Sequence, residues 1–139
     1  MLRQLSTTIK VRAATQGLAD FTAQAHGFVA ESRIQQGLLT LFCRHTSASL
    51  LIQENAAPAA RRDLEAYFSR IAPEDGSYEH GDEGADDMPA HLRAALTASH
   101  LSIPVLAGRL ALGTWQGIYL FEHRRSAPER EIVLHLVGA

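Results

Sequence analysis

Apolar and polar residues alternate along several segments of the chain, and these segments are predicted to be β-strands. Residues 4–12 place Leu5, Thr7, Ile9 and Val11 on one face, which is typical of a half-buried strand. Almost every residue of Leu38–His45 is apolar, which favours a central strand, and residues 50–52 continue extended after an interruption at 46–49. Three more strands are predicted near the C-terminus: Ile103–Val105 running on toward Leu112, Gln116–His123 and Arg130–Val137.

Three other segments repeat apolar residues at helical spacing. The first begins at Asp20 or Thr22 and runs to about Ser32. The second follows Asn55 as its cap, and the third starts at Asp87 and runs to about Ala98. The side chains expected to face the core in the second and third helices are Leu64, Tyr67, Phe68, Ile71, Leu92, Ala95 and Leu96.

The order of these elements ends in a run of strands, which predicts an α+β fold. We expect a single compact domain over residues 1–139, with a mixed, mainly antiparallel sheet and helices packed on it. The length excludes a (β/α)₈ barrel, which needs about 250 residues. No apolar run approaches the roughly 18 residues of a membrane span, and the first residues lack the pattern of a signal peptide.

Composition narrows the class of protein further. Hydrophobic residues make up 46% and charged residues 20% of the chain, which excludes overall disorder. The net charge of −2 gives no reason to expect nucleic acid, and we expect no membrane partner. The single cysteine, Cys43, indicates a reducing, cytoplasmic location. Seven of the fifteen acidic residues fall within residues 74–87, where there is no Lys or Arg.

Residues 80–91 combine two histidines with four carboxylates, whose mutual repulsion a bound cation would relieve. His91 lies in a first helical turn, where the helix dipole keeps its ring neutral, and His80 lies in a flexible loop. His45 ends a strand with its side chain expected to face inward. We therefore expect His45, His80 and His91, with Asp86, to hold a divalent metal ion. The histidines favour Zn²⁺, and Mg²⁺ is the alternative if Asp86 and Asp87 supply the ligands.

Each of these residues also has an ordinary interpretation. The acidic segment can be a solvated loop that contains His80, and His91 can be a surface residue of a helix. His45 can be a core histidine bonded to a backbone carbonyl. The spacing of the histidines matches no standard zinc motif, so these alternatives stay open.

A second group of residues could contact or transform a substrate. We expect Asp87 to orient a ligand or act as a general base, and His123 with Glu122 to transfer protons. Trp115, the only tryptophan, lies between two glycines and could stack on a planar ligand, or simply pack in a hairpin turn. The remaining residues expected to bind substrate are Gln116, Thr46, Ser47 and, for a phosphate, Arg109 and Arg124. Serine hydrolysis through Ser47 or Ser49 is disfavoured because the chain lacks a Gly-x-Ser-x-Gly elbow.

Several motifs together resemble the YjbQ-like family, also called the secondary thiamine-phosphate synthase family. They are His45-Thr46-Ser47-Ala48-Ser49, Glu54-Asn55, His80 with Asp86-Asp87-Met88-Pro89-Ala90-His91, Gly108-Arg109-Leu110, Leu112 to Tyr119, and Glu122-His123. The resemblance implies a compact α+β domain that assembles as a homotrimer, with histidines near subunit boundaries. Two positions depart from the family pattern. Asp87 stands where the family often has Asn, and Ala56-Ala57 precede Pro58 in place of the more usual acidic residue.

The activity that the resemblance implies joins a pyrimidine pyrophosphate to a thiazole phosphate and releases pyrophosphate. Our first hypothesis is therefore a metal-dependent transferase of this kind that binds a small phosphorylated molecule. The alternative is a non-catalytic homotrimer that binds a metal or a small ligand. Turnover separates the two, because the alternative requires only saturable binding.

Overall fold

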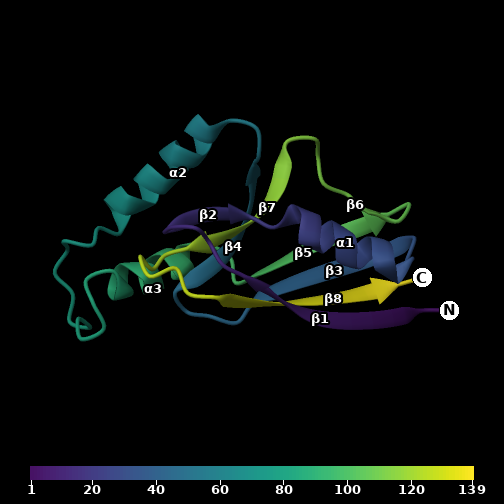
Figure 1. The fold of residues 1–139 in the computed structure, drawn as a ribbon, viewed down its shortest axis with the longest axis horizontal. Helices are drawn as coiled ribbons and strands as arrows, with labels where there is room; N and C mark the ends of the chain where they lie inside the picture. The colour runs from purple at the N-terminus through teal and green to yellow at the C-terminus, as the bar shows by residue number, and fades with distance from the viewer.

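The computed structural model describes residues 1–139 as two antiparallel sheets and three helices (Figure 1). The five-stranded sheet has the order β1 (Arg3–Val11), β8 (Arg130–Gly138), β3 (Gln36–Cys43), β5 (His100–Leu106) and β6 (Arg109–Leu110). The three-stranded sheet has the order β2 (Gly17–Asp20), β7 (Gln116–Glu122) and β4 (Ala48–Glu54). The helices are α1 (Thr22–Ser32), α2 (Pro58–Ile71) and α3 (Asp87–Leu96). The α+β prediction is confirmed, and every strand pair is antiparallel.

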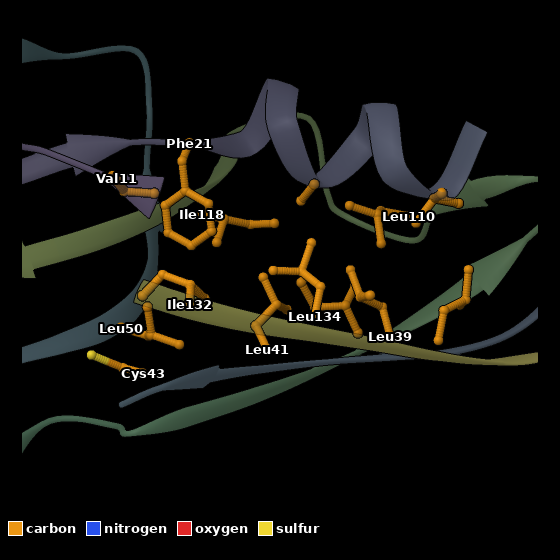
Figure 2. Close-up of a cluster of buried hydrophobic side chains, with 14 of the residues drawn as sticks. Val11, Phe21, Leu39, Leu41, Cys43, Leu50, Leu110, Ile118, Ile132 and Leu134 are labelled. Atoms are coloured by element: carbon orange, nitrogen blue, oxygen red, sulfur yellow. The ribbon is translucent and has the colours of Figure 1, made fainter. Parts of the chain in front are cut away.

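The main core lies between α1 and the five-stranded sheet, as Figure 2 shows. Alternate residues of β8 point into this core, and Ile132, Leu134 and Leu136 are all fully buried. In the register of the sheet they lie beside Cys43, Leu41 and Leu39 of β3, respectively. Every second residue of β8, and of β3 from Leu39 onward, is therefore buried, which follows the pleat of a sheet that buries one face.

The chain changes sheets between β3 and β4. The strand predicted to reach His45 ends at Cys43, and the extended residues 50–52 belong to β4, which pairs with β7 in the smaller sheet. Residues 44–47 cross from one sheet to the other, and Ala48 and Ser49 of the predicted interruption already belong to β4. The short strand β2 was not predicted, because four residues are too few to establish an alternation.

The predicted helices are present, but two of them present different faces to the protein than expected. No residue of α2 is fully buried: Leu64 and Phe68 pack on Leu18, Tyr119 and Phe121, whereas Tyr67 and Ile71 are exposed. In addition, α2 begins after Ala57, whose N–H donates to Glu54 Oε2 (3.1 Å), so Asn55 is not its cap.

The inward face predicted for α3 is wrong. The residues that α3 buries are Asp87, Pro89, Ala90 and Arg93, while Leu96 is 62% exposed. The polar face is buried because Asp87 pairs with Arg124, and Arg93 donates one hydrogen bond to the Ala72 carbonyl oxygen. No helix of the chain combines the length and the apolar character that crossing a bilayer requires.

Trp115 is 63% exposed in the turn before β7, whereas Phe21 is almost fully buried beneath α1. We expect Trp115→Ala to change the free energy of unfolding by less than about 1 kcal/mol, because the side chain has little packing to lose. The matched variant Phe21→Ala should cost roughly 3–5 kcal/mol. Denaturant unfolding of both variants checks this, and a loss at Trp115 equal to that at Phe21 would show that the tryptophan is structural.

Candidate metal centre

The start of α3 brings an acid and a histidine to one side of the helix. Asp87 and His91 are one helical turn apart, so their side chains are neighbours. The turn before the helix passes through Gly84, whose φ of 108° lies in the left-handed region that glycine adopts without strain, and the Asp87 N–H donates to Gly84 O (3.2 Å). This turn folds the acidic loop, residues 72–86, back so that His80 reaches the same place.

His80, Asp87 and His91 form one compact group. Asp87 Oδ2 lies 2.9 Å from His80 Nε2 and 3.1 Å from His91 Nε2. The ligand atoms of the three residues lie within 4.8 Å of one another, and the two imidazole ring centroids are 5.7 Å apart. The side chains of His80 and His91 are 47% and 30% exposed, so solvent reaches the group from one side.

The hydrogen bonding of His91 makes this group suited to a cation. His91 Nδ1 lies 2.9 Å from the carbonyl oxygen of Thr46, which can only accept, so Nδ1 carries the proton. In a neutral ring Nε2 then presents a lone pair to the carboxylate oxygen of Asp87, and these two acceptors repel each other. A metal ion between them would convert both into ligands. Tetrahedral ligands about 2.1 Å from Zn²⁺ lie roughly 3.4 Å apart, so a small outward movement accommodates the ion.

Arg124 holds the acidic side of the group in place. Its Nη1 donates to Asp87 Oδ1 (2.8 Å), its Nε to Asp86 Oδ2 (3.1 Å) and its Nη2 to Glu83 O (2.9 Å). Without a metal ion, burial by itself raises the pKa of Asp87, but the charge of a protonated His91, the hydrogen bond and charge of a protonated His80, and the charge of Arg124 outweigh it and hold this pKa below its usual value. Arg124, predicted to bind phosphate, is therefore engaged by carboxylates, and Asp86, predicted as a ligand, accepts from Arg124 and the Arg125 N–H (2.9 Å).

His45 is not brought to this group. Its Nε2 accepts the backbone N–H of Glu131 (2.8 Å), and burial, followed by the charge of Arg130, lowers its pKa. This arrangement corresponds to the ordinary interpretation of His45 as a partly buried structural histidine, although its partner is an N–H group and not a carbonyl. The prediction failed to place it because the strand ends two residues before His45, so its side chain need not follow the inward face of β3.

Trp115, Gln116 and Arg109 lie at the opposite end of β7 from the metal group. The six steps from Gln116 to Glu122 span roughly 20 Å at about 3.3 Å per residue. Arg109 and Gln116 line a separate open pocket of about 620 Å³, and Gln116 Oε1 accepts the Gly113 N–H (2.7 Å). Within one chain, these predicted substrate residues and the metal group therefore cannot contact the same small ligand.

Glu122 and His123 are fully buried, and neither belongs to the group of His80, Asp87 and His91. The carboxylate of Glu122 accepts from Arg130 Nε (2.7 Å) and Nη2 (2.5 Å), and Arg130 Nη2 also donates to Ser47 O (3.1 Å). Glu122 therefore pairs with Arg130 and not with His123. Thr46 and Ser47, which were predicted to bind substrate, use their backbone carbonyl oxygens as acceptors. Thr46 O accepts from His91, and Ser47 O accepts from Arg130.

A chain of hydroxyl groups determines that Nε2 of His123 carries a proton. Thr97 Oγ1 donates its single proton to Arg93 O (2.8 Å), because a carbonyl oxygen can only accept. Thr97 Oγ1 therefore accepts from Ser49 Oγ, which lies 2.5 Å away. Ser49 Oγ then accepts from His123 Nε2 (2.9 Å), which leaves Nδ1 buried without a partner. Burial, with the charges of Arg93 and Arg130, lowers the pKa of His123 to about 3. Ser49 is only 1% exposed, which agrees with rejecting it as a nucleophile.

Asp87 was predicted as a general base, or as a ligand only if the ion is Mg²⁺, and not as the carboxylate between the two histidines, although its spacing of four residues from His91 is a usable signal. Arg93 was not predicted either, because a lone arginine in an amphipathic helix is ordinarily a solvent-exposed residue.

The buried His123 makes stability depend on pH. In the unfolded chain it takes up a proton below pH about 6.5, whereas in the folded chain it does so only near pH 3, so acidification favours unfolding. Between pH 6.5 and 4.5, where carboxylates are still mostly ionised, His123 should remove about 2–3 kcal/mol of unfolding free energy. Denaturant unfolding of wild type and His123→Gln in the presence of chelator measures this contribution.

The His123→Gln variant should show a flatter dependence on pH, and His26→Gln, which changes an exposed histidine, should keep the wild-type slope. Equal slopes for wild type and His123→Gln would contradict the assignment of a buried neutral imidazole.

Comparison with known proteins identifies relatives over nearly the full chain. The sequence model of a family described as "UPF0047 protein YjbQ-like" matches residues 7–139. A UPF0047 protein of Synechocystis is 51% identical over 128 residues, which cover 90% of this chain and 87% of that protein. The UPF0047 protein YjbQ of Escherichia coli O157:H7 is 48% identical over 106 residues, covering 76% and 77% of the two chains.

A solved structure from Sulfolobus solfataricus, described as a YbjQ-like protein of unknown function, matches with a TM-score of 0.92 and 27% identity over the whole of both chains. None of these descriptions names an activity. The resemblance noted in the sequence is thus confirmed at the level of the family: the chain belongs to the UPF0047 family of YjbQ-like proteins.

Proposed function

We propose that this chain is a metal-dependent enzyme whose metal ion is held by His80, Asp87 and His91. The observation that carries this proposal is the contact of a single Asp87 oxygen with the Nε2 atoms of both histidines. Two imidazoles and a carboxylate are the ligand set of several catalytic zinc sites, and they leave a fourth position open. The histidines favour Zn²⁺ over Mg²⁺, which prefers oxygen ligands.

The surrounding residues support a preorganised centre. Thr46 O fixes the ring orientation of His91, and Arg124 fixes the carboxylate of Asp87 from its other oxygen. A bound metal ion would supply Lewis acidity to an oxygen of the substrate. The exposed side of His80 gives a ligand access to this position.

For the reaction itself, we propose the formation of thiamine phosphate from a pyrimidine pyrophosphate and a thiazole phosphate, as the family resemblance implies. A cation close to the leaving pyrophosphate fits this chemistry, because it offsets the charge that develops there. The alternative is a non-catalytic homotrimer that binds a metal or small ligand at the same residues. It predicts stoichiometric metal binding without product.

The metal centre is tested by mutation of its residues. We expect wild type to bind one Zn²⁺ per chain and His91→Ala to bind none, because the ring supplies one of three ligands. His26→Ala and His45→Ala should keep stoichiometric metal, since neither ring belongs to the group. Binding should also fail on acidification, because a protonated imidazole cannot ligate. Elemental mass spectrometry of the purified variants measures the metal content, and circular dichroism checks their folding.

The same preparations distinguish enzyme from binding protein in a thiamine-phosphate assay. Product from metal-loaded wild type, and none from His91→Ala, supports the enzyme. Metal bound without product sinks the proposed reaction and favours the alternative. Equal metal content in His91→Ala and His26→Ala rejects the metal centre itself.

We also propose that the chain assembles as a homotrimer, which the family resemblance implies. Large apolar side chains support an interface: Leu38 and Phe42 of β3 are 40% and 46% exposed, as are Tyr67 (48%) and Ile71 (45%) of α2. Sedimentation velocity at micromolar concentration should give about 46 kDa, three times the 15.2 kDa of one chain. A single species near 15 kDa would refute the assembly.

A further inference from the structure

A second pocket adjoins the metal group and has a different character. It has a volume of about 580 Å³ and is lined by residues from four parts of the chain, among them Gln16, Ser69, Glu74, Asp75, Arg93 and Arg125. It shares Glu74 and Ala85 with the smaller pocket that His80 lines, so the two hollows are contiguous. Its size is in the range of pockets that bind small molecules.

The carboxylate of Glu74 lies in this pocket and contacts two groups that could bind an anion, the amide of Gln16 and the guanidinium of Arg125. Glu74 Oε1 accepts from Gln16 Nε2 (3.0 Å), and Glu74 Oε2 pairs with Arg125 Nη2. Gln16 is held for this contact by a second bond from Nε2 to the carbonyl oxygen of His123 (2.8 Å). Only 17% of the Glu74 side chain is exposed, although it belongs to the acidic loop.

Arg93 lines the same pocket with most of its hydrogen-bonding capacity unused. It is 5% exposed, and of its five N–H groups one bonds within the protein, from Nη2 to Ala72 O (2.6 Å). Its Nε is buried without a partner. The bond to Ala72 stabilises the end of α2 and accounts for one donor, but it leaves the buried Nε unexplained. An unpaired buried donor is costly, so it points to a missing acceptor.

The shape of the missing acceptor follows from the donors. The two oxygens of the Glu74 carboxylate are taken by Gln16 and Arg125, and neither hydrogen bonds to Arg93. A tetrahedral phosphate presents three oxygens and can meet Gln16, Arg125 and Arg93 together. Arginine is also well suited to phosphate, through paired N–H donors.

We propose that the pocket formed by Gln16, Arg93 and Arg125 binds the phosphate group of a small phosphorylated molecule, and that Glu74 is the internal carboxylate this phosphate displaces. This proposal rests on the proposed function in one respect: it takes the phosphate to belong to the substrate of the metal centre. It replaces the predicted phosphate ligands Arg109 and Arg124.

The experiment titrates inorganic phosphate into metal-free full-length protein and follows binding by calorimetry. Glu74→Gln removes the competing charge while preserving the size of the side chain, and it should tighten phosphate binding about tenfold. Asp75→Asn is the matched control, because it removes the same charge from the same pocket but contacts neither arginine. It should change the affinity by less than about threefold.

The arginines are tested in the Glu74→Gln background. Arg125→Gln should abolish the gain in affinity, and since 69% of this side chain is exposed, its loss should leave the fold intact. Arg93→Gln should do the same, with folding checked by circular dichroism. Equal tightening by Glu74→Gln and Asp75→Asn would overturn the proposal, as would affinity unchanged by loss of Arg125.

A further variant separates this proposal from the metal centre. Phosphate binding that persists in His91→Ala supports the pocket whatever becomes of the metal centre. Binding that is lost in His91→Ala but retained in Arg125→Gln would overturn the pocket and place the anion at the histidines instead.

Discussion

The carboxylate of Asp87 is the group on which the arrangement of the site depends. It is 1% exposed, and a buried carboxylate without compensation would cost several kcal/mol. Arg124 supplies charge to one oxygen, and His80 and His91 approach the other. Because these partners come from the end of β7, the acidic loop and α3, satisfying this one charge brings three separate parts of the chain together.

Much of the fold could be predicted from the sequence, because β1 alternates apolar and polar residues and β3 and β7 are dense in apolar residues, and both patterns are directly visible. The inward face of α3 could not. Its apolar residue Leu96 is exposed, while Asp87 is buried because Arg124 compensates its charge, and Arg93 is buried with a bond to the Ala72 carbonyl. Arg124 follows Asp87 by 37 residues. Local patterns record apolar burial well, but they do not record ion pairs between distant segments.

The candidate site, like the fold, could be predicted from the sequence only in part. The density of acids and histidines in residues 80–91 was enough to indicate a cation, and the structure brings His80 and His91 together. The structure does not bring His45 to them. His45 lies beyond the end of β3, where the strand no longer determines the direction of its side chain. Trp115 and Gln116 share β7 with Glu122, yet the length of an extended strand keeps them away from the metal group.

The antiparallel pairing of β1 with β8 has a practical consequence. Arg3 lies opposite Gly138 in the register, so the two chain ends are neighbours, and in Figure 1 they lie at the far side of the molecule from α3 and the acidic loop. A fluorescent reporter or affinity tag at either end is therefore remote from the histidines. The ends are also close enough for a short peptide to join them, which makes this protein a suitable scaffold for circular permutation.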